Sequence, residues 1–151
     1  MPAQPAIHAS CVAMDTPAGP AAALITGRAG AGKSRLALEL ISRGAALVAD
    51  DRVTLTREGD ALFAAAPAPI RGLIEARGVG LLRLPALDRA RVVLAVDLDR
   101  AESERLPPAR ESLLNGVRIP LVLCGDDADK AAAMAPALAA LLRAGGTRAA
   151  P

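Results

Sequence analysis

The stretch Gly27-Arg28-Ala29-Gly30-Ala31-Gly32-Lys33-Ser34 decides the fold, because it joins a strand-like segment to a helix-like one. An apolar run at residues 22–25 precedes it, and residues 33–43 place apolar side chains at helical spacing after it. This is the context that a G-x-x-x-x-G-K-[ST] loop requires in order to bind phosphates. The sequence therefore predicts a strand, loop and helix unit that binds a nucleoside triphosphate.

The parts of this loop have separate expected roles. Backbone N–H groups at the start of the helix would face the phosphates, where the helix dipole adds partial positive charge. The glycines would let the backbone approach closely, Lys33 would reach the β- and γ-phosphates, and the Ser34 hydroxyl would ligate Mg²⁺. We therefore expect residues 27–34 to form the nucleotide-binding loop.

The magnesium ion needs an acidic partner, and the sequence offers two places for it. The pair Asp50-Asp51 ends a short apolar run, and Asp97 follows the apolar run at residues 92–96. Two adjacent carboxylates can divide the work, because one can hold the metal while the other accepts a proton from an attacking hydroxyl. Spacing alone does not choose between the two places.

The rest of the chain predicts one α/β domain with a mixed β-sheet, over residues 1–144, followed by a flexible tail at 145–151. Apolar runs separated by turn signals predict strands at residues 7–14, 21–26, 45–49, 52–56, 62–66, 91–98 and 117–124. Helices are expected at residues 33–43 and 70–75. A final helix is expected to be capped by Asp126-Asp127 and kinked near Pro136.

Composition excludes several classes of function. The 18 basic and 16 acidic residues are spread along the chain, without the basic block that a nucleic-acid partner would require. The longest apolar stretch, residues 131–142, is about half a membrane span, so we expect a soluble, cytoplasmic protein with no membrane partner. Cys11 and Cys124 are far apart and are expected to be buried, reduced thiols.

Four ordered motifs carry a family resemblance: Gly27-x-x-Gly30-x-Gly32-Lys33-Ser34, Ala37-Leu38-Glu39-Leu40-Ile41-x-Arg43-Gly44, Leu47-Val48-Ala49-Asp50-Asp51 and Leu73-Ile74-Glu75-x-Arg77-Gly78-x-Gly80. Together they resemble the catalytic domain of the HPr kinase/phosphorylase family, and the last is similar to that family's E-I-R-G-L-G signature. The resemblance is strongest over residues 25–82 and extends thinly to 123. It implies a P-loop fold related to phosphoenolpyruvate carboxykinases. It also implies that ATP and Mg²⁺ are used to phosphorylate a serine of HPr, the phosphocarrier of the sugar phosphotransferase system.

The resemblance also implies roles for individual residues. Asp51 would be the general base on the serine hydroxyl, with Asp50 beside it supporting the metal region. Ser34 and Glu75 would hold Mg²⁺, and Lys33 would stabilise the transferring phosphoryl group.

Two further residues are carried over from the family, and the chain departs from the family elsewhere. His8 lies where the family has an active-site histidine in an H-G pair, although Ala9 replaces the glycine. Arg105 matches the arginine of the family's D/E-R-L segment and could neutralise charge on phosphate. The family's N-terminal domain and its P-V-x-x-G-R segment are absent from the sequence, so kinase activity is implied more firmly than phosphorylase activity. Short forms of this kind resemble the HPr kinases of α-proteobacteria, whose substrate would be the HPr-like carrier of a nitrogen-related or regulatory system. The family also suggests a homo-oligomer, with the C-terminal helix as a contact.

Two other functions remain open at this point. A small-molecule P-loop kinase would need an arginine-lined acceptor pocket, which Arg71, Arg77 and Arg83 could supply, and a lid segment, which is not visible. A non-catalytic nucleotide-binding regulator would need only the loop.

Overall fold

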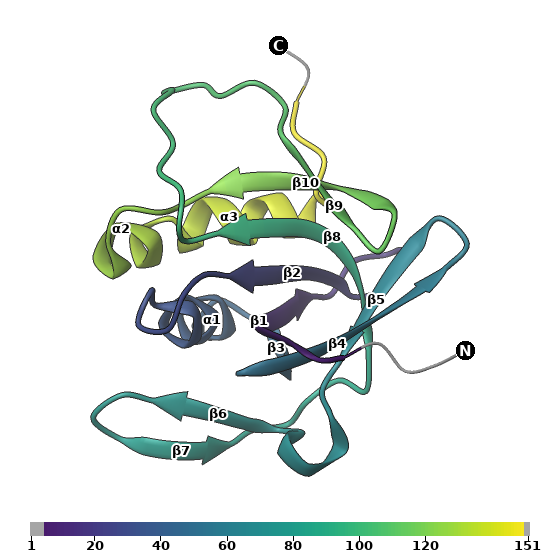
Figure 1. Ribbon diagram of the computed structural model, residues 1–151, viewed down its shortest axis with the longest axis vertical. Helices are drawn as coiled ribbons and strands as arrows, with labels where there is room; N and C mark the ends of the chain where they lie inside the picture. The colour runs from purple at the N-terminus through teal and green to yellow at the C-terminus, as the bar shows by residue number, and fades with distance from the viewer. Residues whose placement is uncertain (1–4, 150–151) are drawn as a thin grey trace.

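The largest sheet is mixed, and the helices of the described residues lie on one of its faces (Figure 1). The computed structural model describes residues 5–149. Along one path the strands are ordered β3 (Ala46–Ala49), β1 (Ile7–Met14), β2 (Ala21–Thr26), β8 (Ala90–Asp97), β10 (Val117–Leu123) and β9 (Glu111–Leu114). Strands β2, β8 and β10 are parallel, whereas β1 is antiparallel to β2 and β3. The predicted α/β class with a mixed sheet is confirmed.

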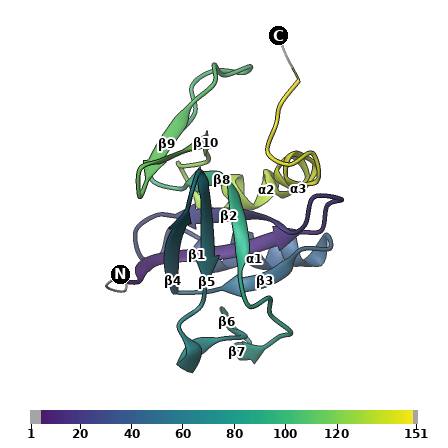
Figure 2. The same ribbon diagram turned by 90° about the vertical axis from the view of Figure 1, so that its right-hand side faces the viewer.

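A hairpin of β4 (Arg52–Glu58) and β5 (Ala61–Ala65) covers the other face of this sheet. Its first strand pairs with the start of β1, and its second pairs with the start of β8. Figure 2 shows both strands crossing the direction of β1 and β2. The apolar side chains between the hairpin and the sheet form a second core, which includes Leu24, Val53 and Leu62.

The first core lies between the sheet and the helices. Helix α1 (Lys33–Ser42) buries Leu36, Ala37 and Leu40 against it, as the helical spacing predicts. The helix ends where expected, because Gly44 donates its N–H to the Ile41 carbonyl at 3.0 Å. Thus α1 is fixed by its apolar face while its N-terminus lies at the carboxyl end of β2.

Two predicted helices are wrong in detail. Residues 70–75 are not a helix, since a 3₁₀ turn, η1 (Ala68–Ile70), is followed by strand β6 (Leu73–Ala76). Gly72, at φ +82°, breaks any helix there, and a Cβ on it would lie 2.9 Å from the Leu84 carbonyl oxygen. The C-terminal helix is two helices, α2 (Ala128–Ala133) and α3 (Ala135–Arg143), because Pro136 in the first turn of α3 cannot continue the hydrogen-bond ladder of α2.

The caps of these C-terminal helices refine the prediction. Asp127 is the N-cap of α2 and accepts the Lys130 N–H at 2.7 Å, whereas Asp126 pairs with the Lys130 side chain instead. Gly145 and Gly146, the first residues of the expected tail, close α3 by donating to the carbonyls of Leu142 and Leu141. The first four residues of the predicted domain, 1–4, and the last two of the predicted tail, 150–151, lie outside the described residues.

Strands β6 and β7 (Gly80–Arg83) form a separate two-stranded sheet, seen at the bottom of Figure 1. Ile74 is fully buried and packs into the α1 core, so one face of this hairpin anchors it. The side chains of Glu75 and Leu81 are paired across the strands on the opposite face. Residues 73–75, the second half of the predicted helix, therefore belong to a β-hairpin, and the free face of this hairpin is available to a site.

Both cysteines are buried and unpaired, as predicted. Burial raises the pKa of the Cys11 thiol to about 12 and that of Cys124 to about 11. Within residues 5–149, no helix is both long enough and apolar enough to span a membrane.

Candidate functional site

A pocket of about 900 Å³ opens between the glycine-rich loop, the β6–β7 hairpin and the ends of β1 and β3. Its lining contains most of the residues that the sequence singles out: His8, Ala29, Gly30, Gly32, Lys33, Ser34, Asp50, Asp51 and Glu75. Gly27, Arg28, Ala31 and Arg105 are not part of the lining. The fold thus gathers one set of polar side chains from β1, α1, β6 and the turn after β3.

The glycine-rich loop places the N-terminus of α1 at this pocket. Gly32 has φ +101°, and a Cβ on it would lie 2.8 Å from the Cβ of Ala128 on α2, so only glycine fits there without a shift. The helix begins at the next residue, and the Leu36 N–H donates to the Gly32 carbonyl at 2.9 Å. The first-turn N–H groups and the helix dipole therefore favour an anion at the pocket.

Lys33 is 7% exposed and is held by the loop itself. Its Nζ donates to the carbonyl oxygens of Gly27 at 2.6 Å and Arg28 at 2.9 Å. Burial lowers the pKa of Lys33, and the carboxylates of Asp99, Asp50 and Asp51 oppose that shift. The ammonium group is a compact positive charge beside the start of α1, and it can also donate hydrogen bonds to an anion bound in the pocket.

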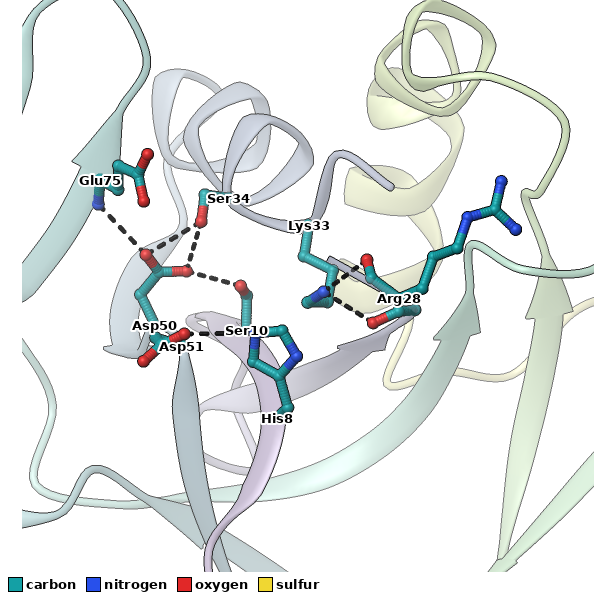
Figure 3. A network of polar contacts seen from close by, with 9 residues as sticks. His8, Ser10, Arg28, Lys33, Ser34, Asp50, Asp51 and Glu75 are labelled. Atoms are coloured by element: carbon teal, nitrogen blue, oxygen red, sulfur yellow. Dashed lines mark hydrogen bonds and ion pairs between the residues drawn. The ribbon is translucent and has the colours of Figure 1, made fainter. Parts of the chain in front are cut away.

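Asp50 ties four elements together (Figure 3). It is 4% exposed and accepts hydrogen bonds from Ser10 Oγ at 2.6 Å and from Ser34 Oγ at 2.8 Å. It also accepts the Glu75 N–H at 3.1 Å. Each oxygen of this buried carboxylate is therefore satisfied by the protein, which fixes Ser34 and β6 relative to β3.

The Asp51 carboxylate is exposed and lies beside a different partner, His8. Its backbone has φ +70°, a left-handed conformation that aspartate tolerates better than most residues. This turn buries one carboxylate and leaves the other 68% exposed, with Oδ1 at 3.2 Å from Nε2 of His8. The two neighbouring aspartates thus differ in their surroundings. Asp50 is buried and accepts hydrogen bonds from the protein, whereas Asp51 is exposed beside His8 and is a candidate general base.

The residues around Ser34 fit a hard cation such as Mg²⁺. Figure 3 shows the side chains of Ser34, Asp50 and Glu75 at one end of the network, and their donors are a hydroxyl and two carboxylates. Within residues 5–149, no cluster of three or more His, Cys, Asp and Glu side chains is placed to hold a metal. A metal here would thus need the serine, and the phosphates of a nucleotide, to complete its ligands.

The alternative carboxylate, Asp97, is engaged elsewhere. It accepts Arg100 Nε at 2.8 Å and the Asp99 N–H at 2.7 Å. Partial burial raises the pKa of Asp97, but these hydrogen bonds outweigh it and leave the pKa below its usual value. Its neighbour Asp99 accepts the Arg28 N–H at 3.0 Å and so supports the glycine-rich loop from outside the pocket. The contact with Ser34 is made by Asp50.

The arginines are mostly outside the pocket. Arg105 is exposed, on the segment that links β8 to β9, which Figure 1 shows at the opposite end of the molecule from the β6–β7 hairpin. Arg71 pairs with Asp88, and Arg83 donates to the Arg71 carbonyl at 3.4 Å. Of the three arginines expected to line the acceptor pocket of a small-molecule kinase, only Arg77 lines this pocket. The arrangement therefore gives little support to a small-molecule kinase.

Ser10 is a site residue that the sequence reasoning missed. Its side chain is fully buried in β1 and donates to Asp50. The available signal was a hydroxyl within a run of otherwise small and apolar strand residues, because a buried polar group needs a specific partner.

Comparison with known proteins identifies the family. Residues 4–104 match the family described as HPr Serine kinase C-terminal domain. The HPr kinase/phosphorylase of Leptothrix cholodnii is 42% identical over 122 residues, which cover 71% of this chain and 37% of that protein. The enzyme of the same name from Bordetella pertussis is 45% identical over 96 residues, which cover 56% of this chain and 31% of that protein. This chain therefore spans about a third of the length of these relatives.

A solved structure is also similar over nearly the whole chain. The Hpr(Ser) kinase/phosphatase from Coxiella burnetii superposes with a TM-score of 0.75 at 27% identity, covering 93% of this chain and 90% of that one. The family match covers well over half of the chain and includes every residue of the pocket network from His8 to Glu75. This chain belongs to the HPr serine kinase C-terminal domain family.

Proposed function

We propose that the chain is the catalytic domain of a kinase that uses ATP and Mg²⁺ to phosphorylate a serine of the phosphocarrier HPr. The observation that supports this most strongly is the division of labour at Asp50-Asp51. Asp50 is bound to Ser34, whereas Asp51 is exposed in the same pocket beside His8. A site that only bound nucleotide would need no second, solvent-facing carboxylate at this point.

The phosphates of ATP would bind along residues 27–34, which form the P-loop of this proposal. The N–H groups at the start of α1 and the Lys33 ammonium would receive the negative charge that develops on the transferring phosphoryl group. To do so, Lys33 would exchange its bonds to the Gly27 and Arg28 carbonyls for bonds to phosphate oxygens. The loop would thus hold the lysine near the phosphate-binding N–H groups before the nucleotide arrives.

Ser34, Asp50 and Glu75 would hold Mg²⁺. When bound, the ion would neutralise phosphate charge and orient the leaving group. Ser34 Oγ would have to turn a lone pair toward the ion, and its present bond to Asp50 already places it beside that carboxylate.

Asp51 would accept the proton of the substrate serine. The serine oxygen would form a bond to the γ-phosphorus as the bond from that phosphorus to the β,γ-bridging oxygen breaks, leaving ADP and phosphoserine. His8, 3.2 Å from the Asp51 carboxylate, would orient it and share its charge. Arg105 would take part only if the segment between β8 and β9 moved toward the pocket. The dephosphorylation of phosphorylated HPr is expected to be weak.

A phosphotransfer assay tests this proposal. The protein is incubated with Mg-ATP and with the HPr of the same genome, and an acid-stable phosphoserine is expected on HPr. An HPr variant with the acceptor serine replaced by alanine is the matched control.

Other outcomes would contradict the proposal. ATP turnover on small metabolites without transfer to HPr would indicate a small-molecule kinase. Tight ATP binding with no transfer to any carrier would indicate a nucleotide-binding regulator. Light scattering would show whether the expected homo-oligomer forms.

A further inference from the structure

We infer that the free face of the β6–β7 hairpin is the docking surface for the acceptor protein, which would place an apolar patch beside its reactive serine against Val79 and Leu81. This inference rests on the proposed function, because it assumes that the acceptor is a folded protein. The free face of the hairpin would be the part of the pocket that selects that protein.

The apolar wall of the pocket has no role in phosphate chemistry. Among residues 5–149 the large apolar side chains that are exposed are Val79, Leu81, Leu106, Leu113 and Met134. Val79 is 77% exposed and Leu81 is 67% exposed, and both line the pocket. Because both line one pocket, they form an apolar rim that a bound molecule would cover.

The hairpin presents these side chains in a fixed position. Ile74, on its other face, is fully buried against the α1 core, and this packing leaves Leu81 on the exposed face of the hairpin. Leu81 is the cross-strand partner of Glu75, whose N–H is bound to Asp50. The apolar surface is therefore coupled by one strand pair and one hydrogen bond to the carboxylate beside Ser34.

The order of groups in the pocket favours the acceptor over the nucleotide as the occupant. Figure 3 shows Glu75, Ser34, Lys33 and Arg28 in sequence across the site. The glycine-rich loop lies at the Arg28 end, and the hairpin lies at the Glu75 end, where the γ-phosphate and Asp51 would meet. A serine must come within about 3 Å of Asp51 to give up its proton, so the protein surface around it would overhang the hairpin.

Charge adds a second feature to this surface. Arg77 lines the same rim, and none of the ion pairs found among residues 5–149 includes it. The expected partner surface is therefore apolar beside the serine, with an acidic group within reach of Arg77.

The test uses Val79→Asp and Leu81→Asp, with Leu113→Asp as the matched control. Leu113 is 68% exposed, on β9, and is not part of the pocket lining. A buried new carboxylate opposes docking, so each hairpin variant should raise the KM for HPr by about tenfold or more. For Val79→Asp, which changes a residue without a strand partner, the kcat at saturating HPr and the Kd for ATP should stay within about twofold, and the control should match the wild type. Val79→Ser, a milder change, should raise the KM less and keeps the test available if an aspartate variant fails to fold.

Several results would overturn the inference. An unchanged KM for HPr in both aspartate variants, with wild-type transfer intact, would remove the docking role and leave the proposed function standing. An equal loss of ATP affinity would assign the wall to the nucleoside, and loss of oligomers in the hairpin variants alone would assign it to a second copy of this chain. Absence of transfer by the wild-type protein would reject the proposed function and this inference together.

Discussion

Replacing Ser10 with alanine should weaken the fold through a single hydrogen bond. Ser10 Oγ donates at 2.6 Å to the Asp50 carboxylate, and neither side chain is more than 4% exposed. A hydrogen bond to a buried charged group is worth about 1.5–3 kcal/mol, and the Asp50 carboxylate loses one of its donors in this variant. We therefore expect the free energy of unfolding to fall by about 2 kcal/mol, which is about a thirtyfold change in the folding equilibrium constant.

Equilibrium urea unfolding measures this change. With a slope of about 2 kcal/mol/M, the midpoint should drop by about 1 M. Ser42→Ala is the matched control, since its hydroxyl donates to the Glu39 carbonyl on the exposed last turn of α1, and it should change stability by less than about 0.5 kcal/mol. A Ser10→Ala protein with wild-type stability would refute the view that Asp50 is a buried charge maintained by the protein.

Two further predictions concern the loop support and the buried thiol. Asp99→Ala removes the acceptor of the Arg28 N–H and should weaken ATP binding, whereas Asp99→Asn keeps an acceptor and removes a negative charge near the phosphates, so its Kd measured by calorimetry should be no weaker than wild type. An equal loss of ATP affinity in both variants would mean that the negative charge of Asp99, and not its hydrogen bond with the Arg28 N–H, supports ATP binding. Burial raises the pKa of the Cys11 thiol to about 12 in the folded protein, against an ordinary value of 9.0. The folded protein keeps a proton that the unfolded chain loses, so Cys11 should contribute a fall of about 1.4 kcal/mol in the free energy of unfolding for each pH unit between about 9 and 12. Guanidinium unfolding of Cys11→Ala across this range should show a shallower loss, and an unchanged slope would contradict the assignment.

The sequence predicted the glycine-rich loop, α1 and most strands because their signals are local. Residues 27–34 carry their own spacing, and Leu36 and Leu40 repeat at helical intervals. The strand β9 was missed, although Asn115-Gly116 is a strong hairpin signal, with φ of 49° and 79° at the turn. The helix expected at residues 70–75 failed because a short apolar run fits either element, and the decision came from Gly72 and from packing of Ile74.

The candidate site was predictable as a set of residues and not as an arrangement. Asp50 and Asp97 were equivalent by spacing, and only the tertiary fold places Asp50 against Ser34. Ser10 and the exposed hairpin face depend on contacts between elements distant in the sequence, for which no local pattern exists. The family resemblance supplied the proposed roles, and the structure supplied the different partners of Asp50 and Asp51.

In the proposed mechanism, Asp51 would accept the proton of the serine while its neighbour Asp50 would support the metal region. A single-turnover phosphotransfer assay with Asp51→Asn and HPr tests it directly, together with the Kd for ATP in Mg²⁺. The amide keeps the shape of the side chain and loses its basicity, so transfer should slow by about 10²- to 10⁴-fold with the Kd for ATP within about twofold. Transfer at the wild-type rate by this variant would contradict the account.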